Sequence, residues 1–486
     1  MDRRAGLAGW GPGDRGGATG LLRGKPENGH HRVTFVELFF DLVFVFAVTQ
    51  LSHALLEHLS PLGALQTALL LLAVWWVWIY TSWVTNWLDP ETTPVRLMLF
   101  ALMLAGLVLS TSLPKAFDAR GWAFAGAYVA MQVGRSLFML WALAGRSPGN
   151  FRNFQRVTLW LGLSALFWLA GACLDPSQRL MLWTLALILD YASPALGFWT
   201  PGLGRSTTAD WDVEGGHLAE RCGLFVIIAL GESIVVTGVK FADQVWTGTT
   251  VAAFLVAFVG TVAMWWVYFN IGAERASARI VASSDPGRLA RLAYTYLHIV
   301  LIAGIIVSAG ADELVLSHPL GHSEPSTIAV ILGGPALYLL GNILFKRTTA
   351  SRLALSHLVG LALLAGLGAV APFLPPILLG AASTWCWWSS PPGKPGRCRG
   401  MPRPALIQRP PHDLKTPAMS ARHWRKAVRS AMSAVPWCRI SAQPEATTAI
   451  SSIRLSPRSW SSTAHSGRSQ SSSVDRRARK AVARAW

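Results

Sequence analysis

The chain has 486 residues, of which 52% are hydrophobic and only 14% charged, and its mean hydropathy is +0.38. These values exclude an ordinary soluble globular protein and predict an all-α, polytopic membrane protein whose partner is the lipid bilayer. The net charge of +18 does not indicate nucleic-acid binding, because the first 352 residues hold 24 basic against 22 acidic residues and the remainder holds 19 against 3. We therefore expect no nucleic-acid partner.

The N-terminal stretch, residues 1–31, is Gly-rich and basic. It lacks the apolar core and the small-residue cleavage site of a secretory signal peptide. We expect it to be a cytoplasmic tail.

Eleven segments of about 20 mostly apolar residues are long enough to cross a bilayer as helices. They lie at about 33–55, 65–87, 95–113, 121–144, 156–174, 180–200, 218–240, 249–271, 291–311, 326–345 and 353–374. Up to Arg352, loops on the side of the N-terminus carry 18 Lys and Arg, and loops on the opposite side carry 4. Since basic loops stay inside the cell, the sequence predicts a cytoplasmic N-terminus.

A twelfth helix begins near Ile377 and is incomplete, because Pro391 and Pro392 follow after about three turns and proline does not continue a helix interior. Residues 381–486 then form a basic, Arg/Ser/Ala/Pro-rich tail without a hydrophobic period, which predicts disorder. Two interpretations of this tail stay open. It is either a native basic arm for anionic lipid headgroups or the product of a frameshift that replaced the twelfth helix.

Two parts of the chain share an order of motifs. "VTFVELFFDLVFVFAVTQ" and "HLAERCGLFVIIALGESIVV" both carry acids near one end, and a span with a Trp-Trp pair follows each of them, Trp75-Trp76 and Trp265-Trp266. Six spans separate the matching segments, so both copies have the same orientation. We predict two parallel repeats of six helices, residues 32–212 with spans 1–6 and residues 213–380 with spans 7–11 and the incomplete twelfth.

Glu37 and Asp41 lie four residues apart in the first span and therefore on one helical face. A carboxylate in hydrocarbon costs about 3 kcal/mol, so such groups usually face protein or water and have a function. Two carboxylates this close discourage joint ionisation, and the pair would hold one proton or a cation. The alternative is structural, with Glu37 at the cytoplasmic rim and Asp41 bound to an arginine or a backbone amide.

The seventh span carries Glu220 and Arg221 near the rim and Glu232 twelve residues beyond Glu220, about 18 Å deeper at the rise of an α-helix. The neighbours of Glu232, Gly231 and Ser233, are small and permit close approach of another helix. We expect Glu220 and Glu232 to contribute to the proton or cation site. A structural hydrogen bond between helices is the alternative for Glu232.

Asp190 lies in the sixth span, four residues before Pro194, whose ring frees the carbonyl of Asp190. A helix broken beside an acid can coordinate a cation, and a kink with Asp190 bound to Arg135 is equally compatible. Arg135 is a basic residue at the middle of a span and needs a partner. The candidates for this partner are Asp41, Asp190 and Glu232.

Arg135 and Arg221 are expected to balance the charge of the acids. His298 is a candidate proton relay, because imidazole titrates near neutral pH, with a satisfied structural histidine as the alternative. The five cysteines show no metal-ligand spacing, and the sequence contains no phosphate-binding loop and no HExxH, GxSxG or CxxC motif. We expect no metal, no cofactor and no enzymatic activity.

Four motifs together resemble the bacterial low temperature requirement A (LtrA) family over about residues 31–375: "TFVELFFDLVFVFAVTQLS", "LDYASPALGFW", "HLAERCGLFVIIALGESIVVTG" and "YTYLHIVLIAGIIVSAGADELVL". The resemblance implies a multi-pass protein of the bacterial inner membrane, and it implies no transport substrate or reaction. The incomplete twelfth helix departs from the family pattern. The polar positions characteristic of the family correspond to Glu37, Asp41, Asp190, Glu220, Arg221 and Glu232.

These residues predict a carrier or permeation protein for a small solute or an ion, with an intramembrane carboxylate site at the interface of the two repeats. The alternative is a structural or signalling membrane protein that transports nothing. In that case the buried acids only pair with Arg135 and Arg221 to fix helix packing.

Overall fold

The computed structural model describes residues 20–24, 32–207, 214–269, 279–280, 283, 285–350 and 355–388. The chain divides into two compact units, Met1–Arg397 and Cys398–Trp486. The second unit, most of the predicted cytoplasmic tail and most of the predicted disordered tail lie outside the described residues.

Six long helices make up the first half of the described chain. They are α1 (Phe35–Glu57), α2 (Pro61–Trp87), α3 (Thr93–Ser112), α4 (Gly121–Leu143), α5 (Pro148–Ala172) and α6 (Pro176–Ala195). Proline in the first turn starts four of them, where its missing N–H costs no hydrogen bond. At the start of α2, Ser60 also accepts a hydrogen bond from the backbone N–H of Gly63 at 3.1 Å.

The second half follows the same all-helical plan. It contains α7 (Gly215–Ala242), α8 (Gly248–Phe269), α10 (Pro286–Ala290), α11 (His298–Ser317), α12 (Pro325–Ala350), α13 (Leu355–Val370) and α14 (Pro376–Trp388). A π-helical segment, Arg291–Leu297, joins α10 to α11. The structure thus confirms the predicted all-α fold class.

A helix occupies each of the eleven predicted spans, and nine of the described helices are long and apolar enough to cross a membrane. Helices α5 and α6 are not among the nine, because polar side chains such as Arg156, Arg179 and Asp190 lower their hydropathy. The incomplete twelfth span is present as α14, which has 13 residues up to Trp388. The number of helices that cross the bilayer stays a prediction.

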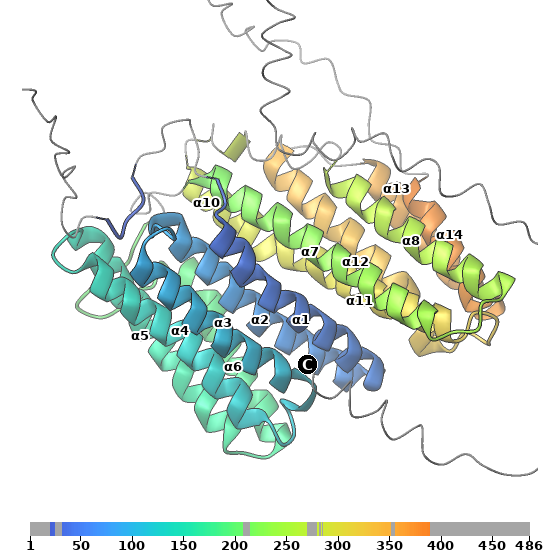
Figure 1. Cartoon of the computed structure of the whole chain (residues 1–486), viewed down its shortest axis with the longest axis horizontal. Helices are drawn as coiled ribbons and strands as arrows, with labels where there is room; N and C mark the ends of the chain where they lie inside the picture. The colour runs from blue at the N-terminus through green and yellow to red at the C-terminus, as the bar shows by residue number, and fades with distance from the viewer. Residues whose placement is uncertain are drawn as a thin grey trace, which may run out of the picture. The chain divides into compact units, whose positions relative to one another are not determined.

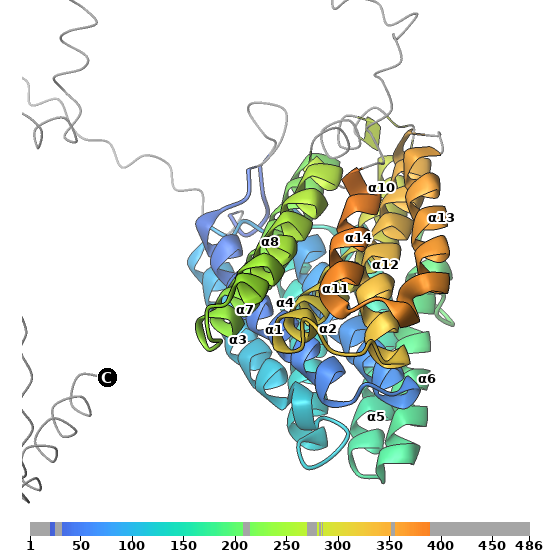
Figure 2. The ribbon, with the colours of Figure 1, turned by 90° about the vertical axis from the view of Figure 1, so that its right-hand side faces the viewer.

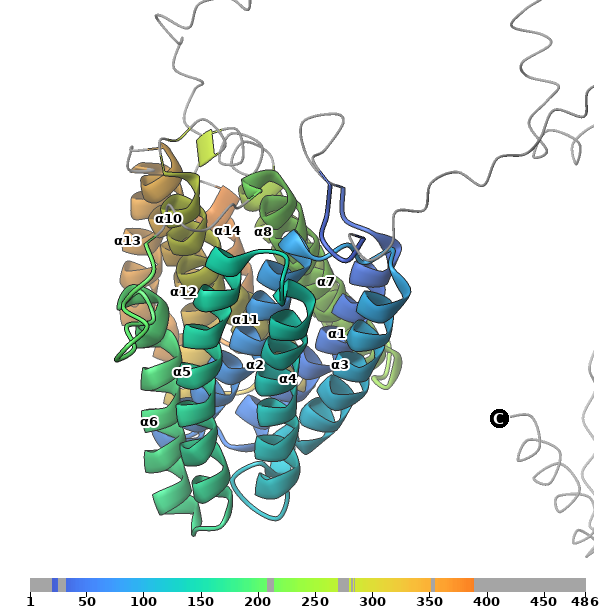
Figure 3. The same ribbon diagram turned by 90° about the vertical axis from the view of Figure 1, so that its left-hand side faces the viewer.

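Most consecutive helices pack against one another, and α1 and α7 also pack extensively against α3 and α11. Figure 1 shows α1–α6 as one group and α7–α14 as a second group. Helices α3, α4, α5 and α6 lie side by side in that order in Figure 3, and α14 lies beside α8, α12 and α13 in Figure 2. The groups meet where α1 and α2 pack against α7 and α11.

Several neighbour relations recur in both groups. Helix α1 packs against α2 and α3, and α7 packs against α8 and α11; α6 contacts α2, and α14 contacts α8. The two Trp-Trp pairs differ, since Trp75 and Trp76 are buried whereas Trp265 and Trp266 are 44% and 45% exposed. The duplication itself stays a prediction.

Helices α11 and α12 approach one another closely at three glycines, Gly304, Gly334 and Gly341. A side chain on Gly304 would lie 2.5 Å from the backbone nitrogen of Tyr338, and one on Gly334 would lie 2.7 Å from that of Ser308. Only glycine permits such backbone proximity, which increases the packing contact between membrane helices. Helices α11 and α12 therefore pack closely within the second group.

Candidate functional site

Polar side chains from α1 and α7 form a cluster at the end of the bundle where both helices begin. Both carboxylate oxygens of Glu37 are occupied. Oε1 lies 3.0 Å from His217 Nε2 and 3.1 Å from Arg221 Nη1, and Oε2 accepts from Arg23 Nη2 at 3.0 Å. The backbone N–H and the hydroxyl of Thr34 also donate to Oε2, each at 2.9 Å, so Glu37 completes the N-terminal cap of α1.

Asp41 lies one turn deeper and shares the guanidinium of Arg221. Its Oδ1 accepts from Arg221 Nη2 at 2.6 Å and from the indole N–H of Trp78 at 2.8 Å. Its Oδ2 is buried without a hydrogen-bond partner in the part of the chain that the structure describes. Glu37, Asp41 and Arg221 are all fully buried.

Arg23 and His217 complete this cluster, and the sequence did not single them out. Arg23 lies in residues 20–24, which pair with the end of α2 through Arg23 N to Trp87 O at 2.8 Å and Asp89 N to Leu21 O at 2.9 Å. His217 precedes Arg221 by one helical turn, a spacing that could have indicated a shared face. No pattern in the Gly-rich N-terminal stretch marks Arg23.

Two carboxylates and two guanidinium groups make the Glu37–Asp41 cluster neutral overall. Buried charges require such pairing, and removing one partner is costly because the other charge is left unpaired. For Glu37 and Asp41 this geometry fits the structural alternative, since arginine guanidinium groups contact three of their four carboxylate oxygens. We call the cluster of Arg23, Glu37, Asp41, His217 and Arg221 the ion-pair cluster.

Glu232 has a different environment from Glu37 and Asp41. It lies in the middle part of α7, is 7% exposed, and accepts a hydrogen bond from the hydroxyl of Thr49 on α1. No ion pair to Glu232 exists among the described residues. Glu232 is thus a buried acid at the α1–α7 contact that no cation of the described residues balances.

An apolar layer separates Glu232 from the ion-pair cluster. Phe44 and Val48 lie between Asp41 and Thr49 on α1, and Phe225 lies between Arg221 and Glu232 on α7; all three are buried. The Phe225 ring packs against Trp78 at 4.3 Å and Trp75 at 5.7 Å between ring centroids. These rings close the interface between the two polar regions.

At the opposite end of α1 and α7, Glu313 of α11 lies near two basic side chains. Its carboxylate is 3.8 Å from His53 Nε2 on α1 and 3.6 Å from Lys240 Nζ on α7. Ser52 lies between this region and Thr49 on α1, and its hydroxyl is buried without a partner within the described ranges. These residues were missed, although Glu313 stands in the motif "AGADELVL".

Arg135 does not form the predicted ion pair with Asp41, Asp190 or Glu232; in the described chain it contacts no acid. Its guanidinium donates to the carbonyl of Val77 at 3.1 Å, to the hydroxyl of Thr81 at 2.9 Å and to the side-chain oxygen of Gln132. Neutral oxygen atoms take the place of the predicted carboxylate partner. Helix α2 supplies two of them beside Arg135, a backbone carbonyl and a hydroxyl.

Arg135 and Asp190 are connected indirectly. The Tyr128 hydroxyl donates to Asp190 Oδ2 at 2.7 Å, and Gln132, which binds Arg135, donates to the Tyr128 oxygen at 3.2 Å. The indole N–H of Trp168 also donates to Oδ2 at 3.3 Å. Asp190 therefore faces α4 and α5, away from Glu37, Asp41 and Glu232.

Pro194 and Asp190 lie near the end of α6, and the interpretation of Asp190 as a cation ligand stays a prediction. Helix α6 ends at Ala195, one residue after Pro194, so the proline lies in its last turn. The carbonyl of Asp190, which the proline ring frees, accepts from the Ser193 hydroxyl at 2.8 Å.

His298 and Glu220 lie apart from Glu232. His298 is fully buried, with Nδ1 3.2 Å from the Ala293 carbonyl and Nε2 2.8 Å from the Tyr268 hydroxyl, so both ring nitrogens are occupied as in a structural histidine. The Glu220 carboxylate accepts from the backbone N–H of Val33 at 3.4 Å near the start of α1. Of the predicted acids, only Glu37 and Asp41 share a cluster.

Among the described residues, no group of three or more His, Cys, Asp or Glu side chains is placed to hold a metal ion. The polar groups at the α1–α7 interface are carboxylates, guanidinium groups, an imidazole and hydroxyls.

Comparison with known proteins gives two related results. The model of the bacterial low temperature requirement A protein (LtrA) matches residues 32–388. An uncharacterized protein of Rhizobium meliloti (strain 1021), RA0937, is 41% identical over 350 residues, which cover 72% of this chain and 86% of that protein. No solved structure matches.

Proposed function

This chain belongs to the bacterial LtrA family, and we propose that it is a carrier or permeation protein in which Glu232 binds a proton or a monovalent cation during passage through the membrane. The proposal places the protein in the bacterial inner membrane with its N-terminus in the cytoplasm, as the distribution of basic loops favours. The ion-pair cluster then lies toward the cytoplasm and Glu313 toward the periplasm.

The observation that carries the proposal is the contrast between Glu232 and the other acids of the α1–α7 interface. Glu37 and Asp41 are balanced by Arg23 and Arg221, whereas Glu232 has a hydroxyl of Thr49 as its partner. Acids within membrane segments are costly and typically belong to ion or proton pathways. A mobile proton or cation is the counter-charge that this position lacks.

Polar side chains lead from Glu232 toward the C-terminal ends of α1 and α7, and we assign them as the route for the proton or cation. From Thr49, the α1 face continues to Ser52 and then to His53, which lies beside Glu313 and Lys240. His53, Glu313 and Lys240 are partly exposed, so this end receives solvent or headgroup water. Hydroxyl, imidazole and carboxylate groups are the side chains that relay protons or coordinate small cations.

In the other direction the apolar layer and the ion-pair cluster close the route. Passage past Phe44 and Phe225 requires α1 and α7 to separate at their N-terminal ends, which breaks the contacts of Arg221 with Glu37 and Asp41. We assign the cluster the role of a latch that is closed in this structure. Alternating exposure of a fixed site is the general plan of carriers with two repeats.

The test is ion flux into liposomes that contain the purified protein. Wild type should move protons or a monovalent cation down an imposed gradient, and Glu232→Gln should abolish this flux, since the amide keeps the acceptor for Thr49 but binds no proton or cation. Glu220→Gln is the matched control, an acid on the same helix outside the proposed route, and should retain flux. Flux in Glu232→Gln equal to wild type would refute the assignment.

The second candidate is the structural role, which the neutral ion-pair cluster favours. It predicts no flux from any variant and loss of membrane abundance when Arg221 is replaced. The two candidates differ at Glu232, because a structural Glu232 tolerates glutamine without any change in a measured activity.

A further inference from the structure

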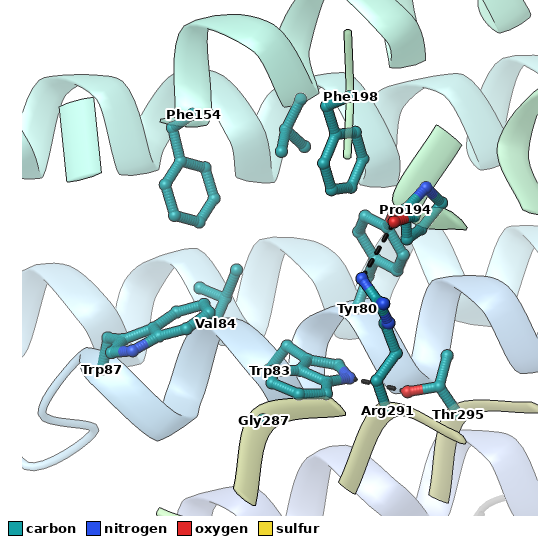
Figure 4. Close-up of a pocket in the computed structure, with 11 residues that line it drawn as sticks. Tyr80, Trp83, Val84, Trp87, Phe154, Pro194, Phe198, Gly287, Arg291 and Thr295 are labelled. Atoms are coloured by element: carbon teal, nitrogen blue, oxygen red, sulfur yellow. Dashed lines mark hydrogen bonds between the residues drawn. The ribbon is translucent and has the colours of Figure 1, made fainter. Parts of the chain in front are cut away.

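A cavity of about 80 Å³ lies between the two groups of helices, away from Glu232. Its walls come from α2, α5 and the end of α6 on one side and from α10 and the π-helical segment Arg291–Leu297 on the other, as Figure 4 shows. A volume of roughly 15 Å³ already holds a water molecule, so this cavity has room for a small organic ligand.

Aromatic rings dominate the cavity. Trp83, Trp87, Phe154 and Phe198 line it together with Tyr80. The rings are fixed by one another and by hydrogen bonds: Trp87 lies edge-on to Phe154 with centroids 5.9 Å apart, and the Trp83 indole donates to the Thr295 hydroxyl at 2.9 Å. Pre-ordered rings bind a flat apolar group with little loss of side-chain entropy.

Arg291 is the cation among the described residues that line the cavity. Arg291 Nη1 donates to the carbonyl of Pro194 at 2.9 Å, which holds the guanidinium at the cavity wall (Figure 4). No acidic side chain forms an ion pair with Arg291 in the described part of the chain, and its remaining N–H donors are available to a ligand. Arg291 begins a π-helical segment, a distortion that is frequent at functional sites.

We propose that this cavity binds a small aromatic carboxylate, with the ring between the Trp and Phe side chains and the carboxylate on Arg291. A guanidinium binds a carboxylate through two parallel hydrogen bonds, and a mostly apolar pocket with one charged group is the usual form of a small-ligand site. Because both groups of helices contribute walls, the bound ligand contacts the two at once. The proposal is independent of the role of Glu232.

The test is equilibrium dialysis of radiolabelled 3-phenylpropionate against the full-length protein in phosphatidylcholine nanodiscs, with empty nanodiscs subtracted. We expect saturable binding of one ligand per chain and at least about tenfold weaker binding of the uncharged 3-phenylpropanamide, since a hydrogen-bonded charge contributes about 1.5 kcal/mol or more. Arg291→Gln should bind the acid as weakly as the wild type binds the amide.

Arg288→Gln is the matched control, an arginine one turn earlier that pairs with Asp285 at 3.7 Å and does not line the cavity; it should bind like wild type. Val157→Phe fills the cavity without touching the charge and should lose both ligands, which keeps the test decisive where Arg291→Gln folds poorly. Absence of saturable binding to wild type, equal affinity for acid and amide, or tighter binding of octanoate than of 3-phenylpropionate would overturn the proposal.

Discussion

The hydroxyl of Thr49 on α1 donates to the carboxylate of Glu232 on α7, and the two residues are 183 positions apart. Glu37 and Glu220, which open the two proposed repeats, have the same separation. The repeat prediction matches the first span, which carries Thr49, with the seventh span, which carries Glu232, and these two spans pack against one another. Contacts at both ends, Glu37 with Arg221 and Thr49 with Glu232, show that α1 and α7 run parallel (Figure 1). Working sites of two-repeat carriers lie at such an interface.

Removal of the Thr49 hydroxyl should weaken the function of Glu232 without removing its charge. We expect Thr49→Val to reduce flux severalfold, because the only protein hydrogen bond to the carboxylate among the described residues is lost, a change of about 1 kcal/mol. Thr49→Ser keeps the hydroxyl and should keep flux within about twofold of wild type. Equal flux in Thr49→Val and wild type, at matched insertion, would contradict the positioning role.

Replacement of Arg221 should destabilise the protein more than replacement of any other described arginine. Arg221→Gln removes the ion-pair partner of buried Asp41 and one of the two arginines that pair with Glu37, at a cost of about 3–5 kcal/mol. The measurement is the melting temperature in detergent together with membrane abundance. The double change Asp41→Asn and Arg221→Gln removes one charge of each sign, leaves Glu37 paired with Arg23, and should recover most of the loss; no recovery would show that the charges are not the cause.

Asp190 is expected to tolerate asparagine. Tyr128 and Trp168 donate to one oxygen of Asp190, and the other oxygen has no partner in the described structure, so an amide oxygen can replace the carboxylate. Asp190→Asn should change the free energy of unfolding by less than about 1 kcal/mol, and Asp190→Leu, which leaves the Tyr128 hydroxyl unsatisfied, by about 1–3 kcal/mol. Loss of flux in a stable Asp190→Asn protein would instead return Asp190 to the ion route.

His298→Gln should lower stability and leave flux per inserted molecule unchanged. Glutamine cannot reproduce both contacts of the imidazole, to Tyr268 and to Ala293, while keeping the ring packing against Phe345 at 4.8 Å between centroids. The check is flux normalised to the amount of protein in the liposomes. A fall in normalised flux would support the proton-relay interpretation that the sequence raised.

The helices were predictable because each is a long apolar run that proline, glycine or charged residues end. The sequence also identified the acids as candidate site residues, since carboxylates in apolar segments are rare. The partners of these acids could not be predicted, because they depend on the rotation of each helix about its axis. Arg135 donates hydrogen bonds to Thr81 and Gln132. Arg221 forms ion pairs with both Glu37 and Asp41.

Two features of the structure, the position of Arg23 and the cavity beside Arg291, were not indicated by any sequence pattern. Arg23 reaches Glu37 from a Gly-rich stretch whose path depends on backbone pairing with the end of α2. The cavity beside Arg291 forms from four segments far apart in the chain, and its π-helical wall has no sequence period of its own. Tertiary packing determines both features.

The most direct test of the central claim is flux through liposomes that contain wild type, Glu232→Gln or Glu220→Gln at equal insertion, with proton and monovalent-cation gradients applied in turn. The account predicts flux of one of these ions in wild type and Glu220→Gln and background leak in Glu232→Gln. Flux in Glu232→Gln that matches wild type, or background leak in all three proteins, would contradict it.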